Sequence, residues 1–136
     1  MSQHAAVLFA NDAFYMAFRD RDAAAMNEVW AQREPVTCIH PGWQPLNGRQ
    51  AVMDSWRSIL ANPASPAIRC IGAEAHVVGD VAYVLCYELM PDASLVATNV
   101  FIRDGVSWRL IHHQSGPAPA PPRAAVAADE TPEPLQ

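Results

Sequence analysis

The sequence predicts an α+β fold, in which helices pack against one face of a curved antiparallel sheet. Three observations support this class. Apolar residues recur at helical spacing in the first half of the chain, long apolar and β-branched runs fill residues 68–115, and turn signals separate these runs. A group of helices followed by consecutive antiparallel strands is typical of the α+β class.

Three helices are expected in the first half. The first spans residues 4–19, and the second follows a cap at Asp20 or Asp22. The third spans residues 48–60, after a cap at Asn47. Each has an apolar face at i, i+3 and i+4 spacing. These faces are Val7, Phe14 and Phe18; Met26, Val29 and Trp30; and Val52, Trp56, Ile59 and Leu60.

One short and four long strands are expected. The short strand covers residues 36–40 and ends in the turn His40-Pro41-Gly42-Trp43, because proline fixes φ there and glycine frees it. The long strands are residues 68–78, 81–90 and the two halves of 95–115. Asp104-Gly105 joins these halves, since Asp-Gly between β-branched and aromatic runs is a strong hairpin signal.

Length and composition indicate a single domain over residues 1–116. The chain has 136 residues, of which 51% are apolar, enough for a core without disulfides or metals. Residues 117–136 are rich in proline and alanine and are expected to form a flexible tail. The cysteines (Cys38, Cys70 and Cys86) are odd in number and widely spaced, so we expect reduced thiols in the core.

The charge pattern argues against nucleic acid and anionic membranes as partners. The formal net charge is −5, with 9 basic and 14 acidic residues and no basic run. No segment approaches the ~20 apolar residues that span a bilayer. The first residues lack the pattern of a signal peptide, so the expected location is cytoplasmic.

Four segments follow one another in a characteristic order. They are FYMAFRDRDAAAM with Trp30, VTCIHPGW, LNGRQAVMDSW and ATNVFIRDGVSWRLIHHQS. Together they resemble the SnoaL-like branch of the nuclear transport factor 2 (NTF2-like) superfamily, in a form with an HPGW motif and a terminal WRxxHH strand. The resemblance implies a cone-shaped fold, a curved sheet wrapped around three helices, with a pocket at its wide end. It also implies a homodimer formed through the sheet.

The same resemblance leaves the reaction open. The superfamily includes isomerases, dehydratases, polyketide cyclases and members without known chemistry, and fold alone does not specify function. His40 falls near the place of the isomerases' acidic base, but residues 36–43 contain no Asp or Glu. The isomerases' second, donor carboxylic acid also has no clear counterpart in the ATNVF segment.

Two histidines are the candidates for acid–base chemistry. The ordinary pKa of His40, near 6.5, suits proton transfer at neutral pH, although the ring can instead fix the HPGW turn. His112 and His113 alternate across a strand, so only one faces the interior. We expect His112 to face inward, because His113 shares its face with Arg109, which prefers water or the dimer interface. The alternative is that the face of His113 is the inner one, since a curved dimeric sheet can bury both of its sides.

Four further residues are candidates for binding a ligand. Trp43 follows a Pro-Gly turn, where packing alone explains a large apolar group poorly, and Trp56 can line an apolar pocket. Tyr15 and Asn99 can hydrogen-bond a ligand oxygen, with structural hydrogen bonding as the alternative. No metal is expected, because His40, His112 and a carboxylate such as Glu88 lack the close spacing of metal ligands. No cofactor-binding motif is present either.

These observations support three functional hypotheses. The first is a cofactor-independent isomerase, dehydratase or cyclase that acts on a small organic molecule through His40. The second is a non-catalytic binding domain with the same pocket. The third is a dimerisation or assembly module, in which a sheet face is the functional surface.

Overall fold

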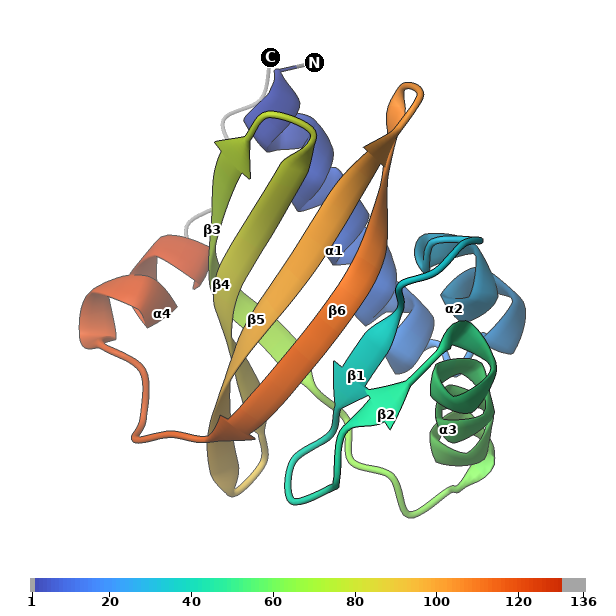
Figure 1. Ribbon diagram of the computed structural model, residues 1–136. Helices are drawn as coiled ribbons and strands as arrows, with labels where there is room; N and C mark the ends of the chain where they lie inside the picture. Colours follow the sequence, from blue (N-terminus) through green and yellow to red (C-terminus); the bar gives the residue numbers. More distant parts are fainter. Residues whose placement is uncertain (1, 131–136) are drawn as a thin grey trace.

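In the computed structural model, residues 2–130 are described, and they form a six-stranded mixed sheet with four helices (Figure 1). The predicted α+β class is confirmed. The elements are α1 (Gln3–Arg19), α2 (Ala23–Val29), β1 (Thr37–Ile39), β2 (Leu46–Asn47), α3 (Arg49–Ala61), β3 (Arg69–Val78), β4 (Val81–Met90), β5 (Ala93–Asp104), β6 (Ser107–Pro117) and α4 (Arg123–Glu130).

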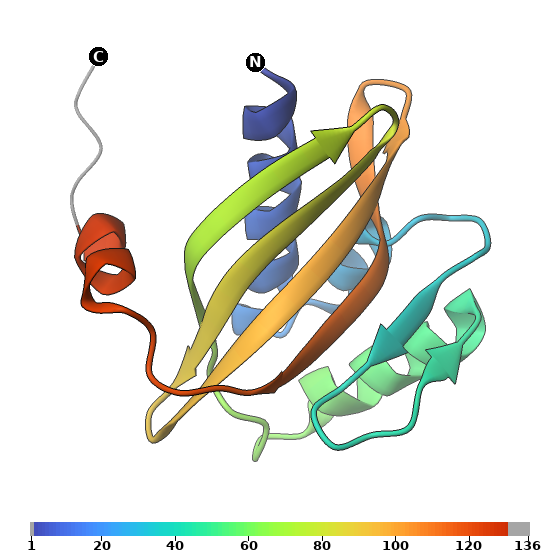
Figure 2. The same cartoon turned by 60° about the vertical axis from the view of Figure 1, so that its left-hand side comes forward.

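The sheet has the strand order β2-β1-β6-β5-β4-β3. Strands β3 to β6 form the expected antiparallel meander, which curves around α1 (Figure 2). The prediction of a wholly antiparallel sheet is wrong at one place, since β1 runs parallel to β6. Parallel neighbours need a long connection, and here α3 and the whole meander supply it. The short strand β2, which pairs with β1, was not predicted.

Tight turns link the long strands as the glycine positions predict. Gly79 and Gly105 both have φ of +63°, a region that suits glycine because it has no Cβ. The β5–β6 hairpin turns at Gly105-Val106, one residue later than expected, since Asp104 pairs with Ser107. The turn between β4 and β5 is also shorter than predicted, because Met90 pairs with Ala93.

The core lies between α1 and the inner face of the sheet. Helix α1 contacts β3, β4 and β6, and α2 packs against both α1 and α3 (Figure 1). Phe14 lies at the centre, with its ring edge-to-face on Tyr15, Trp30 and Trp56. Such aromatic contacts add to the large apolar area that these residues bury. The packing places the ends of α1 and α3 beside the end of the sheet that carries the β4–β5 turn.

Helix α3 is capped by a distant residue. Asn47 was expected to cap it, but Asn47 ends β2 and Gly48, with φ of +93°, occupies the N-cap position without a side-chain hydrogen bond. The Glu34 carboxylate instead accepts hydrogen bonds from the backbone N–H of Arg49 (2.7 Å) and of Val36 (3.0 Å). The carboxylate thus satisfies one exposed donor of the helix, and its negative charge interacts favourably with the positive end of the helix dipole.

Part of the Pro/Ala-rich tail is ordered into a helix. Within residues 117–136, expected to be flexible, Pro117 closes β6 and residues 123–130 form α4, which packs on β3. A Cβ at Gly72 would lie 3.3 Å from the Cβ of Ala125, so the glycine permits this close approach. Residues 131–136 lie outside the described part of the chain. No helix in residues 2–130 is long and apolar enough to cross a membrane.

Candidate functional site

A cavity of about 270 Å³ opens at the end of the sheet that carries the β4–β5 turn. Its walls come from the end of α1, the β1–β2 loop, α3, the α3–β3 loop and the ends of β4, β5 and β6. The lining side chains are Phe18, His40, Pro41, Trp43, Trp56, Ile59, Ser65, Pro66, Ile68, Glu88, Met90, Leu95, His113 and Ser115. Most of this wall is apolar, and the buried polar groups are His40, Glu88, His113 and Ser115. A mostly apolar cavity with a few polar groups is typical of small-molecule sites.

A β-bulge in β6 decides which histidine faces this cavity. Phe101 pairs with Leu110 and Val100 pairs with His112, so Ile111 is an extra residue without a cross-strand partner. One extra residue reverses the alternation of side chains between the two faces of a strand. His113 is therefore buried and lines the cavity, whereas the prediction that His112 faces inward is wrong.

His112 lies at the outer side of β6. Its Nδ1 is 2.7 Å from the hydroxyl oxygen of Thr37 on β1, and the side chain is half-buried. This hydrogen bond joins the two parallel strands. The geometry gives His112 a structural contact and keeps it away from His40 and the cavity.

His40 is buried and hydrogen-bonded to α3. Its Nε2 is 2.9 Å from the hydroxyl oxygen of Ser55, which donates its own hydrogen to the Val52 carbonyl at 2.7 Å. A hydroxyl has one hydrogen, so Ser55 must accept from His40, whose proton is then on Nε2. Nδ1 of His40 keeps its lone pair, with the Cys38 sulfur 3.9 Å away. The pKa of His40 is lowered to about 4 because burial disfavours the charged ring.

The His113 ring is hydrogen-bonded to the side-chain amide of Asn99. Its Nδ1 is 2.5 Å from the side-chain oxygen of Asn99, and its Nε2 is 3.9 Å from Oε2 of Glu88. Burial, followed by repulsion from His40 and His112, lowers the pKa of His113 to about 3. At neutral pH both cavity histidines are thus uncharged. Their ring centroids lie 6.5 Å apart.

Glu88 is the functional candidate that the sequence reasoning missed. It was considered only as a metal ligand, yet it is 2% exposed and lines the cavity. The Tyr15 hydroxyl donates to its Oε2 at 2.6 Å, and Ser115 also hydrogen-bonds the carboxyl. Burial raises the pKa of Glu88, although these two hydrogen bonds act in the opposite direction. Strand alternation could have found it, because Glu88 continues the inward-facing series of Val84 and Cys86.

Tyr15 and Asn99 form a layer behind the cavity wall. The side-chain nitrogen of Asn99 donates to Asn11 at 2.9 Å and to the Tyr15 oxygen at 3.1 Å. Burial, followed by the nearby carboxyl of Glu88, raises the pKa of Tyr15 well above its ordinary value. Both candidate ligand-binding residues therefore contact the polar groups of the cavity and do not line it.

The two tryptophan candidates do line the cavity. Trp43 is 48% exposed and its ring lies edge-on to His40 at 4.7 Å between centroids, which places it at the mouth. Trp56 lies edge-on to His40 at 4.9 Å and is almost fully buried. Its Nε1 has no hydrogen-bond partner within residues 2–130. The structure thus brings together His40, Trp43 and Trp56 among the predicted residues, and adds Glu88 and His113.

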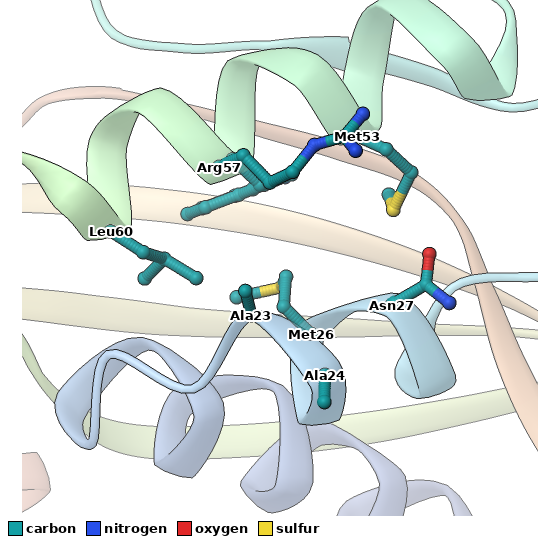
Figure 3. A pocket seen from close by; sticks show the side chains of 8 residues that line it. Ala23, Ala24, Met26, Asn27, Met53, Arg57 and Leu60 are labelled. Atoms are coloured by element: carbon teal, nitrogen blue, oxygen red, sulfur yellow. The ribbon is translucent and has the colours of Figure 1, made fainter.

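A second hollow of about 330 Å³ lies between α2 and α3. Figure 3 shows Met53, Arg57 and Leu60 of α3 opposite Ala23, Met26 and Asn27 of α2. Its one charged side chain, Arg57, forms an exposed ion pair with Asp54 on its own helix. Because it holds no buried titratable group, this hollow offers less chemistry than the cavity at the β4–β5 end.

The buried polar groups suit proton transfer to or from an uncharged molecule. The cavity combines neutral imidazoles, which can accept a proton, with a carboxyl group that keeps its proton to higher pH than a surface glutamate. Within the described residues, no group of three His, Cys, Asp or Glu side chains could hold a metal ion. The three cysteines are free thiols, and burial raises the pKa of Cys38 to about 12.

Comparison with known proteins places this architecture in a family. A profile of the SnoaL-like domain matches residues 7–121. The F-box protein SKIP8 of Arabidopsis thaliana is 26% identical over 112 residues, which cover 81% of this chain and 48% of that protein. The chain therefore spans about half the length of this curated relative.

Two solved structures share the fold and about a third of the aligned residues. One, from Streptomyces avermitilis, is provisionally described as a dehydratase of the NTF2-like family; it is 32% identical with a TM-score of 0.77, over 85% of this chain and 96% of that chain. The other, from Thiobacillus denitrificans, is provisionally described as an association domain of calcium/calmodulin-dependent protein kinase type II. It is 34% identical with a TM-score of 0.72, over 81% of this chain and 93% of that chain.

Proposed function

The chain belongs to the SnoaL-like domain family, and we propose that it binds a small, uncharged organic molecule in the cavity at the β4–β5 end and transforms it by acid–base chemistry. The reaction would be of the isomerase or lyase type, without a cofactor. The single observation behind this proposal is the convergence of His40, Glu88 and His113 on one apolar cavity. The HPGW turn and the WRxxHH strand supply the two histidines, and we take these motifs to mark a branch of the family.

The chemistry follows from the protonation states of the buried groups. A neutral imidazole whose second nitrogen is held by a hydrogen bond presents a defined lone pair, as His40 does through Ser55. A carboxyl group with a raised pKa can donate a proton or a hydrogen bond to a substrate oxygen. A base and an acid in the same apolar cavity are what proton abstraction next to a carbonyl requires. The low pKa of His40 makes it a weak base, which suits a substrate hydrogen that is already acidic.

Ligand binding can be tested with a thermal-shift screen of uncharged aromatic and alicyclic carbonyl and hydroxyl compounds. A ligand of the native state raises the melting temperature by mass action. Ile68→Trp, which fills the cavity, should abolish the shift, whereas Ala24→Trp, which fills the hollow between α2 and α3, should preserve it. Absence of any shift, or loss of the shift in the Ala24 variant only, would contradict the proposed site.

Catalysis can be tested without knowing the product. A bound ketone should exchange the hydrogens next to its carbonyl with deuterium from the solvent, which NMR detects. His40→Ala should slow this exchange by at least about tenfold while the protein stays folded. Binding without exchange would leave the non-catalytic binding domain as the function. A loss of several kcal/mol of stability in His40→Ala would assign that residue a structural role.

A specific observation also favours self-association as a second function. The outer face of the sheet exposes Val81, Tyr83, Leu85 and Val96. Apolar patches of this kind mark protein interfaces, and a relative provisionally described as an association domain is 34% identical to this chain over the aligned residues. We propose that a second copy of the chain covers this face, giving a homodimer.

The oligomeric state tests this assembly. In light-scattering measurements, the wild type should be dimeric and Val96→Asp should shift the population to monomers, because a charge on the face would be buried without a partner. Val106→Asp is the matched control, since Val106 is 98% exposed at the tip of the β5–β6 hairpin. A monomeric wild type, or equal effects of both substitutions, would contradict a dimer through this face.

A further inference from the structure

We infer that Nε2 of His113 and Oε2 of Glu88 form a two-point site for the hydroxyl group of an uncharged aromatic alcohol or phenol, and that Asn99 is the positioning residue for His113. The inference rests on the proposed function, because it specifies which class of molecule the cavity takes. No sequence motif predicts that His113 lies beside Glu88 or that Asn99 binds His113.

The first observation is the tautomer that the amide of Asn99 imposes. Its nitrogen already donates to Asn11 and Tyr15, so its oxygen faces Nδ1 of His113 and can only accept. His113 must therefore carry its hydrogen on Nδ1. Its Nε2 is left with a lone pair, on the side of the ring that faces Glu88.

The second observation is the spacing of the two atoms. At 3.9 Å, Nε2 of His113 and Oε2 of Glu88 are too far apart to hydrogen-bond each other. One oxygen atom placed between them can lie about 2.8 Å from both. Burial raises the pKa of Glu88 and so favours its protonated form. With the proton on Oε2, which also accepts from the Tyr15 hydroxyl, the ligand's hydrogen can point to Nε2 of His113 while its oxygen accepts from the carboxyl group. An ether or a methyl group in the same place lacks the hydrogen that Nε2 requires.

The third observation is the charge of the cavity. Its lining side chains include neither Lys nor Arg, and the one acidic group is the buried Glu88. A carboxylate or phosphate ligand would have no cation to pair with and would lie close to that acid. Burial of an unpaired anion is strongly unfavourable, so the site selects against acids.

The fourth observation is the size and shape of the apolar part. A cavity of ~150 Å³ holds benzene in a protein core. The cavity here is about 270 Å³ and is bounded by the rings of Trp43 and Trp56 together with Pro41. A molecule with one substituted ring or two fused rings fits this space.

The specificity test uses three probes of similar size: 2-naphthol, 2-methylnaphthalene and 2-naphthoate. Wild type should bind 2-naphthol about tenfold more tightly than 2-methylnaphthalene, the scale of one or two net hydrogen bonds, and 2-naphthoate more weakly than either. His113→Phe should bring the first ratio close to one without weakening 2-methylnaphthalene. His112→Phe, the matched control on the outer side of β6, should leave the ratio unchanged.

The positioning role of Asn99 has a readout that needs no ligand. Imidazole ¹⁵N chemical shifts should show His113 with its hydrogen on Nδ1 in the wild type. Asn99→Ala should release this tautomer, and Asn99→Asp should keep it, because the carboxylate still accepts from Nδ1. The Asp variant should in addition raise the pKa of His113, since an adjacent negative charge favours the imidazolium.

The outcomes separate this inference from the proposed function. Equal binding of 2-naphthol and 2-methylnaphthalene by wild type would overturn the hydroxyl site while leaving a binding cavity. Failure of both to bind would overturn the inference together with the cavity function. A hydrogen on Nε2 of His113 in the wild type would overturn the role of Asn99. If His113→Phe does not fold, the probe ratio in wild type and the ¹⁵N shifts still decide.

Discussion

The two faces of the sheet carry opposite kinds of surface. Between the inner face and α1, polar side chains are buried and each has partners. Glu88, Asn99 and His113 of the sheet form one connected group with Asn11 and Tyr15 of α1. On the outer face, apolar side chains such as Leu85 and Val96 remain exposed. A soluble fold normally shows the reverse arrangement, so both faces depart from the usual distribution.

The departures indicate two separate tasks. Buried polar groups are unfavourable unless they are fully hydrogen-bonded, and a connected set on a cavity wall is typical of functional sites. Exposed apolar residues on a long, regular sheet are typical of an interface. The chemistry is therefore expected inside and the association outside, and substitutions on one face should leave the other property intact.

The largest difference is expected between two neighbouring residues of β4. Val84 is fully buried on the inner face and Leu85 is 41% exposed on the outer face. Val84→Asp should lower the free energy of unfolding by more than about 4 kcal/mol, because the charge has no partner in the core. Leu85→Asp should cost the monomer no more than about 0.5 kcal/mol and act on the dimer instead. Urea unfolding with parallel light scattering measures both, and similar losses of stability would erase the distinction between the faces.

The inner face should also make stability depend on pH. The folded-state pKa values of His40 and His113, about 4 and about 3, lie below the ordinary value of 6.5. The unfolded chain thus binds more protons, so stability is highest above pH 6.5 and falls as the pH drops toward 4. We expect the two histidines to lower the free energy of unfolding by about 3 kcal/mol between pH 7 and pH 5. The raised pKa of Glu88 should offset part of this loss. Urea titrations at both pH values check this, and His113→Leu should roughly halve the difference; an unchanged stability would show that the histidines are not buried as neutral rings.

The bulge in β6 provides a third comparison, between adjacent histidines. His113→Leu should destabilise the fold by about 2 kcal/mol, because Asn99 loses its partner inside the core. His112→Leu should cost less than about 1 kcal/mol, since its contact with Thr37 is half-exposed. Thermal unfolding at pH 7 measures both. A larger effect for His112 would mean that the strand alternates without a bulge.

The sequence predicted the fold better than the site, for a physical reason. Helix periodicity and glycine turns are local signals, and they placed α1, β4 and the hairpins well. The bulge at Ile111 depends on the pairing of β6 with β5, and local alternation therefore assigned the wrong histidine to the interior. The partners of His40 and Glu88 are 15 and 73 residues away in sequence, on α3 and α1, and only tertiary packing brings them together. The family resemblance supplied the expectation of a pocket, whereas Trp43 and Trp56, which line the cavity, were chosen from the Pro-Gly turn and the aromatic character of the residues.

The smallest expected effect concerns how the cavity wall is held in place. Helix α3 carries Ser55 and Trp56, and the Glu34 carboxylate binds the backbone N–H of Arg49 at its start. Glu34→Gln keeps the shape but removes the negative charge near the helix N-terminus, so it should cost about 1 kcal/mol. Asp54→Asn is the matched control, because its ion pair with Arg57 lies on the exposed side of the helix and should be worth less than about 0.5 kcal/mol. If Glu34→Gln also weakens binding of 2-naphthol while Asp54→Asn does not, the cap holds α3 and its cavity-wall residues in the position that ligand binding requires. Equal effects of the two variants on stability would show that Glu34 acts only as one more surface charge.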